Sequence, residues 1–197
     1  MNLYSHAVIF AGGKSSRMGK DKALLPFGGE SSLAEYQYKK LTKLFHTVSL
    51  STKENKFDFN CPLILDTKKE SSPLVGILSI FETLEDLDEI FILSVDAPFI
   101  DENIIRKIME ESRRLKMQNE VVDVIVAKSQ NGIEPLCALY KKSILPLVQN
   151  HYTQGNHKLK NLLLEAHTKT VCFSEAKSFT NLNHPQEYEE ALKINLN

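Results

Sequence analysis

The chain has 197 residues, of which 42% are hydrophobic and 25% charged, and its formal net charge is -1. This composition is that of an ordinary globular protein and excludes a disordered chain. The near-neutral charge also excludes a global field that attracts nucleic acid or anionic lipid, so any affinity for phosphate has to be local. The length suits one folded unit, and we predict a single domain over residues 1–197.

Cysteine usage and the N-terminal residues bear on cellular location. Cys61, Cys137 and Cys172 lie far apart and form no C-x-x-C pair, which is typical of buried thiols in a reducing compartment. No apolar run approaches the ~20 residues that a membrane span needs. Residues 1–10 lack the basic start and the cleavage site of a signal peptide. The sequence therefore predicts a soluble, cytoplasmic protein that binds neither nucleic acid nor membrane.

Short apolar segments alternate with longer amphipathic ones along the chain. Apolar segments predict strands at residues 6–11, 47–51, 62–66, 89–95, 121–127, 135–140 and 169–175. Apolar residues spaced three and four apart predict helices at residues 31–45, 72–86, 101–116, 158–166 and 185–194. Such alternation implies crossover helices over a mostly parallel sheet, so the predicted fold class is α/β.

Polar residues follow three of the predicted strands. Gly12 and Gly13 follow the first strand, Asp66 ends the third, and Asp96 comes directly after residues 89–95. Ligands of open parallel sheets bind at the carboxyl ends of the strands, near the point where the strand order reverses. We therefore expect these residues to meet at one edge of the sheet and to form a single site.

The stretch between the first strand and Phe27 combines glycines with cations. Gly12 and Gly13 let the backbone approach a ligand closely, so that successive N–H groups can point at phosphate oxygens. Arg17 and Lys22 add a planar guanidinium and a compact ammonium charge. The alternative is a surface turn rich in glycine and lysine, but the position after an apolar strand and the density of cations favour a phosphate-binding loop.

Two familiar phosphate loops do not fit this stretch. A P-loop reads G-x-x-x-x-G-K-[ST], whereas five residues separate Gly13 from Gly19 and an aspartate follows Lys20. The dinucleotide fingerprint G-x-G-x-x-G is also missing, because Lys14 stands in the place of its second glycine. The loop therefore belongs neither to an ordinary NTPase nor to an NAD-binding domain.

The loop also matches a longer sequence signature. The stretch "AGGKSSRMGKDK" (residues 11–22) resembles the signature L-A-G-G-x-S-x-R-M-G-x-D-K of molybdenum cofactor guanylyltransferases. Further segments resemble motifs of this family in the same order, at residues 72–79, 93–100, 134–146, 155–163 and 179–191. The resemblance runs from residue 6 to about residue 193. It implies one nucleotidyltransferase domain with a Rossmann-like three-layer sandwich, which transfers GMP from Mg-GTP to molybdopterin and releases pyrophosphate.

The resemblance also implies roles for single residues. Arg17, Lys22 and Asp96 would be catalytic, and Asp96 would hold Mg²⁺, with Mn²⁺ as a possible substitute. The implied nucleotide-binding residues are Phe10, Ala11, Gly12, Gly13, Lys22, Thr52, Asp66 and Asp96. The implied pterin-binding residues are Asn181 and Asn183. Lys158 and Lys160 are either a solvated helix face or contacts for the pterin phosphate.

The chain departs from the family pattern at two places that concern the site. The family has a nucleotide-contacting asparagine after the second strand, where this chain has Thr52, and Asn55 could replace it only if the loop shifts. His184 stands where the family has threonine, so we expect a weaker N-cap for the helix at residues 185–194. The first change puts that nucleotide contact in question, whereas the second is expected to cost a little local stability and to leave the reaction unchanged.

Three other functions stay open at this point. A cytidylyltransferase of the same fold acting on the molybdenum cofactor is the nearest, although Gly13 is typical of the guanylyl branch. A sugar-1-phosphate nucleotidyltransferase is further off, because such chains commonly carry longer acceptor-binding segments. A GTP-binding module without turnover is the third.

The substrates implied by the resemblance are GTP and molybdopterin, with molybdenum-insertion and molybdoenzyme-chaperone proteins as further partners.

Overall fold

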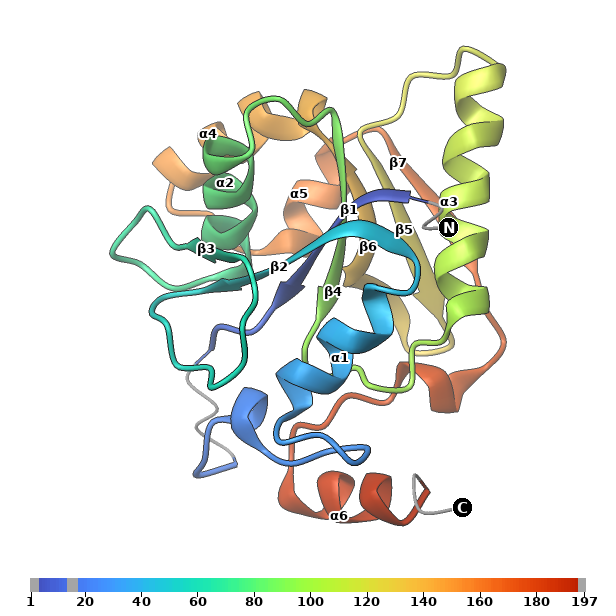
Figure 1. Cartoon of the computed structure of the whole chain (residues 1–197). Helices are drawn as coiled ribbons and strands as arrows, with labels where there is room; N and C mark the ends of the chain where they lie inside the picture. Colours follow the sequence, from blue (N-terminus) through green and yellow to red (C-terminus); the bar gives the residue numbers. More distant parts are fainter. Residues whose placement is uncertain (1–3, 14–17, 195–197) are drawn as a thin grey trace.

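The computed structural model describes residues 4–13 and 18–194 (Figure 1). In this part of the chain, seven strands form one sheet in the order β3-β2-β1-β4-β6-β5-β7. β6 runs antiparallel to its neighbours β4 and β5, and the other neighbouring strands are parallel. The strands are β1 (Tyr4–Phe10), β2 (Phe45–Thr52), β3 (Leu63–Leu65), β4 (Glu89–Ser94), β5 (Val124–Ser129), β6 (Gly132–Lys141) and β7 (Thr168–Cys172).

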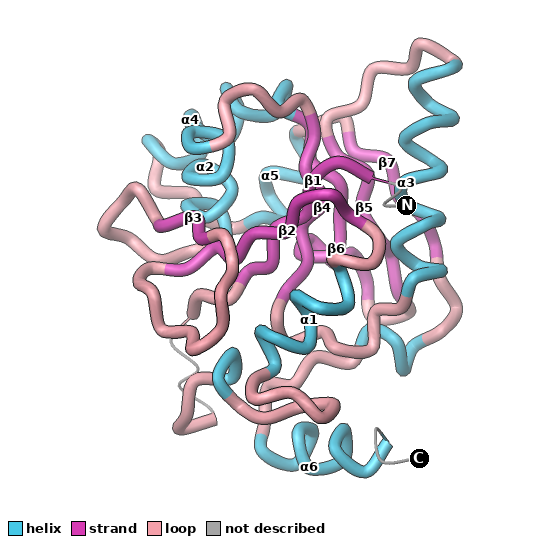
Figure 2. The backbone as a smooth tube through the Cα atoms, viewed as in Figure 1, coloured by secondary structure: helices cyan, strands magenta, loops and turns pink. Residues whose placement is uncertain are grey.

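Helices cover both faces of this sheet. The helices are α1 (Leu33–Leu41), α2 (Pro73–Thr83), α3 (Glu102–Met117), α4 (Leu145–Thr153), α5 (Leu159–Glu165) and α6 (Pro185–Ile194). Short 3-10 turns lie at η1 (Lys22–Leu24), η2 (Lys142–Ile144) and η3 (Ala176–Phe179). Figure 2 shows α1 and α3 apart from α2 and α4, with the strands between them. The buried apolar residues of α1 and α3 join one core, and those of α2, α4 and α5 join another. The predicted three-layer, Rossmann-like α/β fold is therefore confirmed.

The central strands are apolar on both faces because each face has its own core. In β1, Ala7 and Ile9 belong to the core under α1 and α3, whereas Val8 and Phe10 belong to the core under α2. All four side chains are at most 7% exposed. Since successive strand residues point to opposite faces, a strand between two helical layers is apolar at every position. The same rule explains why residues 89–95 read as a continuous apolar run.

Boundaries differ from prediction where the chain turns. The helix predicted over residues 31–45 ends at Leu41, and Phe45 opens β2, where its ring stacks on Phe91 with centroids 5.5 Å apart. α4 was not predicted, because only Val148 and His151 of its nine residues are buried and no apolar stripe marks it.

The prediction that the three cysteines are buried was only partly correct. Cys137 is buried, Cys61 is half-buried and Cys172 is exposed.

The topology places the site. From β1 the chain first builds β2 and β3 on one side and then returns to β4 on the other, so the strand order reverses between β1 and β4. Gly12 and Gly13 follow β1, and Asp96 follows β4, at the carboxyl ends of these adjacent parallel strands. This is the position where open α/β sheets bind ligands. Within residues 4–13 and 18–194, no helix is both long and apolar enough to cross a membrane.

Candidate active site

Three predicted residues from distant parts of the chain, Lys22, Asp96 and Asn183, meet at the ammonium group of Lys22. The Oδ2 atom of Asp96 accepts a hydrogen bond from Lys22 Nζ at 2.5 Å, and its Oδ1 atom accepts one from Ser94 Oγ at 2.6 Å. Lys22 Nζ also donates to Asn183 Oδ1 at 3.0 Å. The side chains of Lys22 and Asp96 are only 15% and 16% exposed, so this ion pair is partly shielded from solvent. The loop after β1, the turn after β4 and the C-terminal segment thus share one polar cluster.

The loop that carries Lys22 is held by a lysine that belongs to none of the matched motifs. Lys56 Nζ donates to Asp21 Oδ2 at 2.5 Å and to the carbonyl of Ala11 at 2.9 Å. The carboxylate of Asp21 also accepts from the backbone N–H of Ala23 and so caps η1. Lys56 therefore ties both ends of the glycine-containing loop to the segment after β2. Its contacts span 35 and 45 residues of sequence, which no local pattern reveals.

Glycine is required at two places around this loop. Gly13 has a φ of +136°, a backbone conformation that side chains rarely adopt. In α2, a Cβ at Gly76 would lie 2.9 Å from the ring of Phe10, so a larger residue would push the helix away from β1. Gly13 thus shapes the loop, and Gly76 lets α2 pack closely against Phe10 of β1, the strand that leads into the loop.

Three adjoining cavities follow this edge of the sheet, and all three are lined by Ser94 and Leu136. The glycine-loop cavity, about 300 Å³, is lined by Gly12, Gly13, Lys22, Asp96 and Asn183 among others. The Asp66 cavity, about 210 Å³, is lined by Phe10, Gly12, Ser51, Asp66, Ser72 and Pro73 among others. The Glu134 cavity, about 420 Å³, is lined by Asp96, Glu134, His157, Lys158, Lys160 and Asn181 among others.

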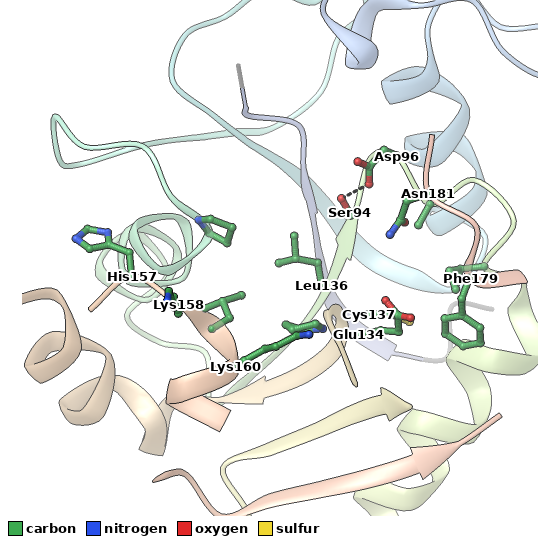
Figure 3. Close-up of a pocket in the computed structure, with 15 residues that line it drawn as sticks. Ser94, Asp96, Glu134, Leu136, Cys137, His157, Lys158, Lys160, Phe179 and Asn181 are labelled. Atoms are coloured by element: carbon green, nitrogen blue, oxygen red, sulfur yellow. Dashed lines mark hydrogen bonds between the residues drawn. The ribbon is translucent and has the colours of Figure 1, made fainter. Parts of the chain in front are cut away.

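Asp96 lines both the glycine-loop cavity and the Glu134 cavity, and therefore stands at their junction. Figure 3 shows the Glu134 cavity with Asp96 and Asn181 on one side and His157 and Lys158 on the opposite side. Leu136 lies between these two sides. A group bound beside the glycine loop and a group bound in the Glu134 cavity would consequently meet at Asp96.

Most of the other predicted residues line one of these cavities, but they do not all line the same one. Phe10 and Ala11 line the glycine-loop cavity, and Asp66 lines the cavity named after it. Asn181 lines the Glu134 cavity, whereas Asn183 lines the glycine-loop cavity, so the predicted pterin-binding pair is divided between two cavities. Arg17 lies outside the residues that the structure describes.

Thr52 is not among the residues that line these three cavities. It is 2% exposed, and its hydroxyl donates to the carbonyl of Glu54. Asn55 is exposed and accepts from the backbone N–H of Phe57. The neighbouring β2 residue Ser51 lines the Asp66 cavity, although no motif in the sequence indicates it.

Glu134 and His157 were also missed, for lack of any local signal. Glu134 lines the Glu134 cavity, and its Oε1 atom accepts a hydrogen bond from Ser129 Oγ at 2.7 Å. His157 Nδ1 lies 2.8 Å from the hydroxyl of Ser72, which caps α2. This contact links a wall of the Glu134 cavity to a residue of the Asp66 cavity.

The oxygen atoms around Lys22 suit a hard cation. The ammonium group of Lys22 lies between a carboxylate oxygen of Asp96 and the amide oxygen of Asn183, which shows that the cluster accommodates positive charge. The described residues contain no group of three or more His, Cys, Asp or Glu side chains that would form a complete metal cage. A few oxygen ligands completed by phosphate oxygens and water is the coordination that Mg²⁺ prefers.

A strand-following glycine loop and a carboxylate at the switch point of a mostly parallel sheet define a nucleotide-binding α/β protein. The family model described as the MobA-like NTP transferase domain matches residues 7–171. The chain belongs to this family and is therefore a nucleotidyltransferase, a class of enzyme that uses a divalent metal ion.

Named relatives match over nearly the whole length. The chain is 34% identical over 187 residues to the molybdenum cofactor guanylyltransferase of Campylobacter jejuni strain 81116, covering 94% of each chain. It is also 34% identical over 193 residues to that of Helicobacter pylori strain G27, covering 95% of this chain and 91% of the relative. These similarities confirm the family predicted from the loop and its companion motifs.

Solved structures agree on the fold. The molybdopterin-guanine dinucleotide biosynthesis protein A of Archaeoglobus fulgidus superimposes with a TM-score of 0.79 at 19% identity, covering 96% of this chain and 97% of that one. An Aquifex aeolicus protein superimposes with a TM-score of 0.74 at 26% identity, covering 91% and 93%. The Rossmann-like arrangement of sheet and helices is thus that of known nucleotidyltransferase structures.

Proposed function

We propose that this nucleotidyltransferase transfers GMP from Mg-GTP to the terminal phosphate of molybdopterin, giving molybdopterin guanine dinucleotide and pyrophosphate. The full-length similarity to guanylyltransferases supports the choice of substrates. The observation that carries the proposal is the position of Asp96 at the junction of the glycine-loop cavity and the Glu134 cavity. A donor nucleotide and an acceptor bound in these two cavities would be adjacent at that carboxylate.

In this reaction an oxygen of the acceptor phosphate forms a bond to the α-phosphorus of GTP. The bond from the α-phosphorus to the oxygen that bridges it to the β-phosphorus breaks, and pyrophosphate leaves with that electron pair. The acceptor phosphate is already an anion, so the reaction needs no dedicated general base. Catalysis then consists of in-line positioning and of neutralising the charge on the leaving group.

The residues of the glycine-loop cavity would serve the triphosphate. The backbone N–H groups of Gly12 and Gly13 would donate to phosphate oxygens, and Lys22, with Arg17, would neutralise the β- and γ-phosphates. Asp96 would hold Mg²⁺, which supplies charge to the phosphate oxygens, and Mn²⁺ is the expected substitute. The adjoining Asp66 cavity, with Phe10 and Asp66 in its lining, would receive the nucleoside.

The Glu134 cavity would hold the acceptor. Its lining combines apolar side chains such as Leu136 and Phe179 with the cations Lys158 and Lys160 and with Asn181. Such a mixture suits a flat, partly apolar pterin that carries a negatively charged phosphate. Lys158 and Lys160 are thus proposed as contacts of the acceptor rather than as a solvated helix face, and Asn183 is proposed to act next to Lys22.

Titration calorimetry with Mg-GTP, Mg-CTP, Mg-ATP and Mg-UTP tests the proposal, together with release of pyrophosphate when molybdopterin is added. We expect selective binding of GTP and pyrophosphate release with molybdopterin. Asp96→Asn should lose the Mg²⁺-dependent part of the GTP affinity and the pyrophosphate release, while its melting temperature stays within a few degrees. Preference for CTP would identify a cytidylyltransferase. Selective GTP binding without pyrophosphate release would identify a binding module, and either result would contradict the proposed reaction.

Three further expectations stay predictions. They are the cytoplasmic location, the single domain over residues 1–197, and the exchange of cofactor with molybdenum-insertion and molybdoenzyme-chaperone proteins. The family model supports the single domain, since it extends over residues 7–171 without interruption. Exchange of the cofactor between proteins is supported only by the place of the named relatives in molybdenum cofactor synthesis.

A further inference from the structure

The turn after β4 presents its backbone carbonyls to α1. This turn, residues 94–100, is here named the Asp96 turn. Gln37 Nε2 donates to the carbonyl of Ala97 at 2.9 Å and lies 3.3 and 3.4 Å from the carbonyls of Ser94 and Val95. Three residues further along α1, Lys40 Nζ donates to the carbonyls of Pro98 and Ile100 at 2.9 and 2.8 Å. Two side chains of one helix thus contact five carbonyls of the Asp96 turn.

Gln37 lies in an apolar environment that does not favour an amide. Its side chain is fully buried, next to the α1 core residues Leu33, Ala34 and Leu41. The Oε1 atom of Gln37 has no hydrogen-bond partner among the described residues. An unpaired buried polar group destabilises the folded state, whereas a leucine of similar size would avoid this cost. The amide is therefore best explained by the carbonyls to which its nitrogen donates.

Neither side chain can act on a ligand directly. Gln37 and Lys40 are not among the residues that line the glycine-loop, Asp66 or Glu134 cavities. The C-terminal segment also holds the backbone of the Asp96 turn, because the N–H of Leu182 donates to the carbonyl of Asp96 at 2.8 Å. With the backbone fixed, the carboxylate of Asp96 has few orientations left.

We propose that Gln37 and Lys40 are positioning residues, which fix the Asp96 turn so that its carboxylate meets the metal–nucleotide complex in one orientation. The inference rests on the proposed function, because it takes Asp96 as the ligand of the divalent metal. Side chains that hold a metal ligand in place commonly contribute 10–100-fold to metal affinity or activity. The same range is expected for Gln37, because it contacts three carbonyls within three residues of the carboxylate.

Gln37→Leu tests the proposal in the full-length protein. Binding of Mn²⁺ in the presence of GTP is measured by electron paramagnetic resonance, alongside the Mg²⁺ concentration that gives half-maximal turnover. We expect Mn²⁺ affinity to fall at least tenfold and the half-maximal Mg²⁺ concentration to rise by a similar factor. Leu41→Ala is the matched control, since it removes a buried α1 side chain that makes no hydrogen bond to the turn. It should lower the melting temperature and leave Mn²⁺ affinity unchanged.

Unchanged Mn²⁺ affinity in folded Gln37→Leu would overturn the positioning role, whatever happens to turnover. An equal loss of affinity in Leu41→Ala would overturn it too, because general loosening of α1 would then suffice. Lys40→Met gives the same test if Gln37→Leu does not fold. Absence of GMP transfer by the wild-type protein would contradict the proposed function, while the Mn²⁺ titration would still decide this inference.

Discussion

Asp66 stands directly after β3, with its carboxyl group half-buried at the Asp66 cavity. Burial raises the pKa of this carboxyl group, and the nearby charge of Lys53 opposes the shift without cancelling it. A carboxylate in such a place is more costly to keep ionised than one in water. Because it lines a proposed nucleoside cavity, we expect this carboxyl group to act in binding rather than in folding.

Asp66→Asn should separate these two roles. We expect Mg-GTP affinity to fall about tenfold, since an amide accepts hydrogen bonds less strongly than a carboxylate. Stability at pH 7.5 should be equal to that of the wild type or higher, within about 1 kcal/mol. A variant that unfolds more easily at pH 7.5, with GTP affinity intact, would assign Asp66 to the fold instead.

The pH dependence of this difference follows from the sign of the shift. Because the pKa of Asp66 is raised in the folded state, the folded protein takes up this proton before the unfolded chain does as the pH falls. Wild-type stability therefore gains from this group on acidification through the raised pKa, whereas the asparagine variant gains nothing. Thermal melts of both proteins between pH 7.5 and 4.5 should show that any stability advantage of Asp66→Asn over the wild type becomes smaller as the pH falls.

Among single residues, the ones predicted from sequence are those whose chemistry is written in a local motif. Lys22, Asp96 and Asn183 sit in three separate motifs, and the structure brings them within hydrogen-bonding distance. Lys56 and Gln37 belong to no motif, since their partners are chosen by the tertiary fold. Thr52 shows the converse: it lies near the family's contact position in sequence, but it is not among the residues that line the three cavities of the site.

At the scale of elements, α6 shows how one residue compensates for another. His184 precedes the helix, where the sequence predicts a weak N-cap. Glu187, three residues later, accepts from the backbone N–H groups of Asn183 and His184 at 2.6 and 2.8 Å. This is the reciprocal half of a capping box, in which the third helical residue satisfies donors at the helix start. The helix start in turn holds Asn183, whose amide oxygen accepts from Lys22.

Glu187→Ala should therefore affect both stability and the site. We expect a loss of about 1 kcal/mol in the free energy of unfolding, typical of a removed helix cap, and a fall of about 2–4 °C in melting temperature. The KM for GTP should rise several-fold through the displaced Asn183. Glu189→Ala is the control, since Glu189 is exposed on the same helix. A KM unchanged in Glu187→Ala would show that Asn183 is held independently of α6.

Elements were predictable where one apolar pattern dominated. The continuous runs that became β1 and β4 are unmistakable, because both faces of these strands are buried. The end of α1 was misplaced, because Leu44 and Phe45 continue its apolar spacing although Phe45 already belongs to the sheet. α4 escaped prediction because the helix lies on the outside of the molecule with two buried residues. Local pattern fails where burial is decided by neighbours distant in sequence.

At the scale of the whole molecule, the proposed donor and acceptor sites draw on different parts of the chain. The glycine-loop and Asp66 cavities are lined mainly by residues before 100, whereas the Glu134 cavity is lined mostly by residues after 130. Alternating strands and helices predicted the layers, but the order of the strands, and with it this division, came only from the structure. Asp96 lines both the glycine-loop cavity and the Glu134 cavity, so a ligand that binds it should stabilise elements on both sides of this division.

Mg-GTP should consequently stabilise the protein as a whole, and the stabilisation should depend on the metal. A ligand at 100 times its Kd adds about 2.7 kcal/mol to the free energy of unfolding. For a chain of this size that corresponds to a rise of about 5–10 °C in melting temperature. We expect this rise with Mg-GTP, a much smaller one with GTP and EDTA, and little change with Mg-CTP.

Asp96→Asn distinguishes a metal effect from simple phosphate binding by the loop. Its melting temperature without ligand should lie near that of the wild type, and Mg-GTP should raise it no more than GTP with EDTA raises that of the wild type. The reason is that the glycine loop and Lys22 remain in the variant, whereas the proposed metal ligand does not. A full shift in Asp96→Asn would remove Asp96 from the metal site and would leave the glycine loop as the only determinant of nucleotide affinity shown by these melts.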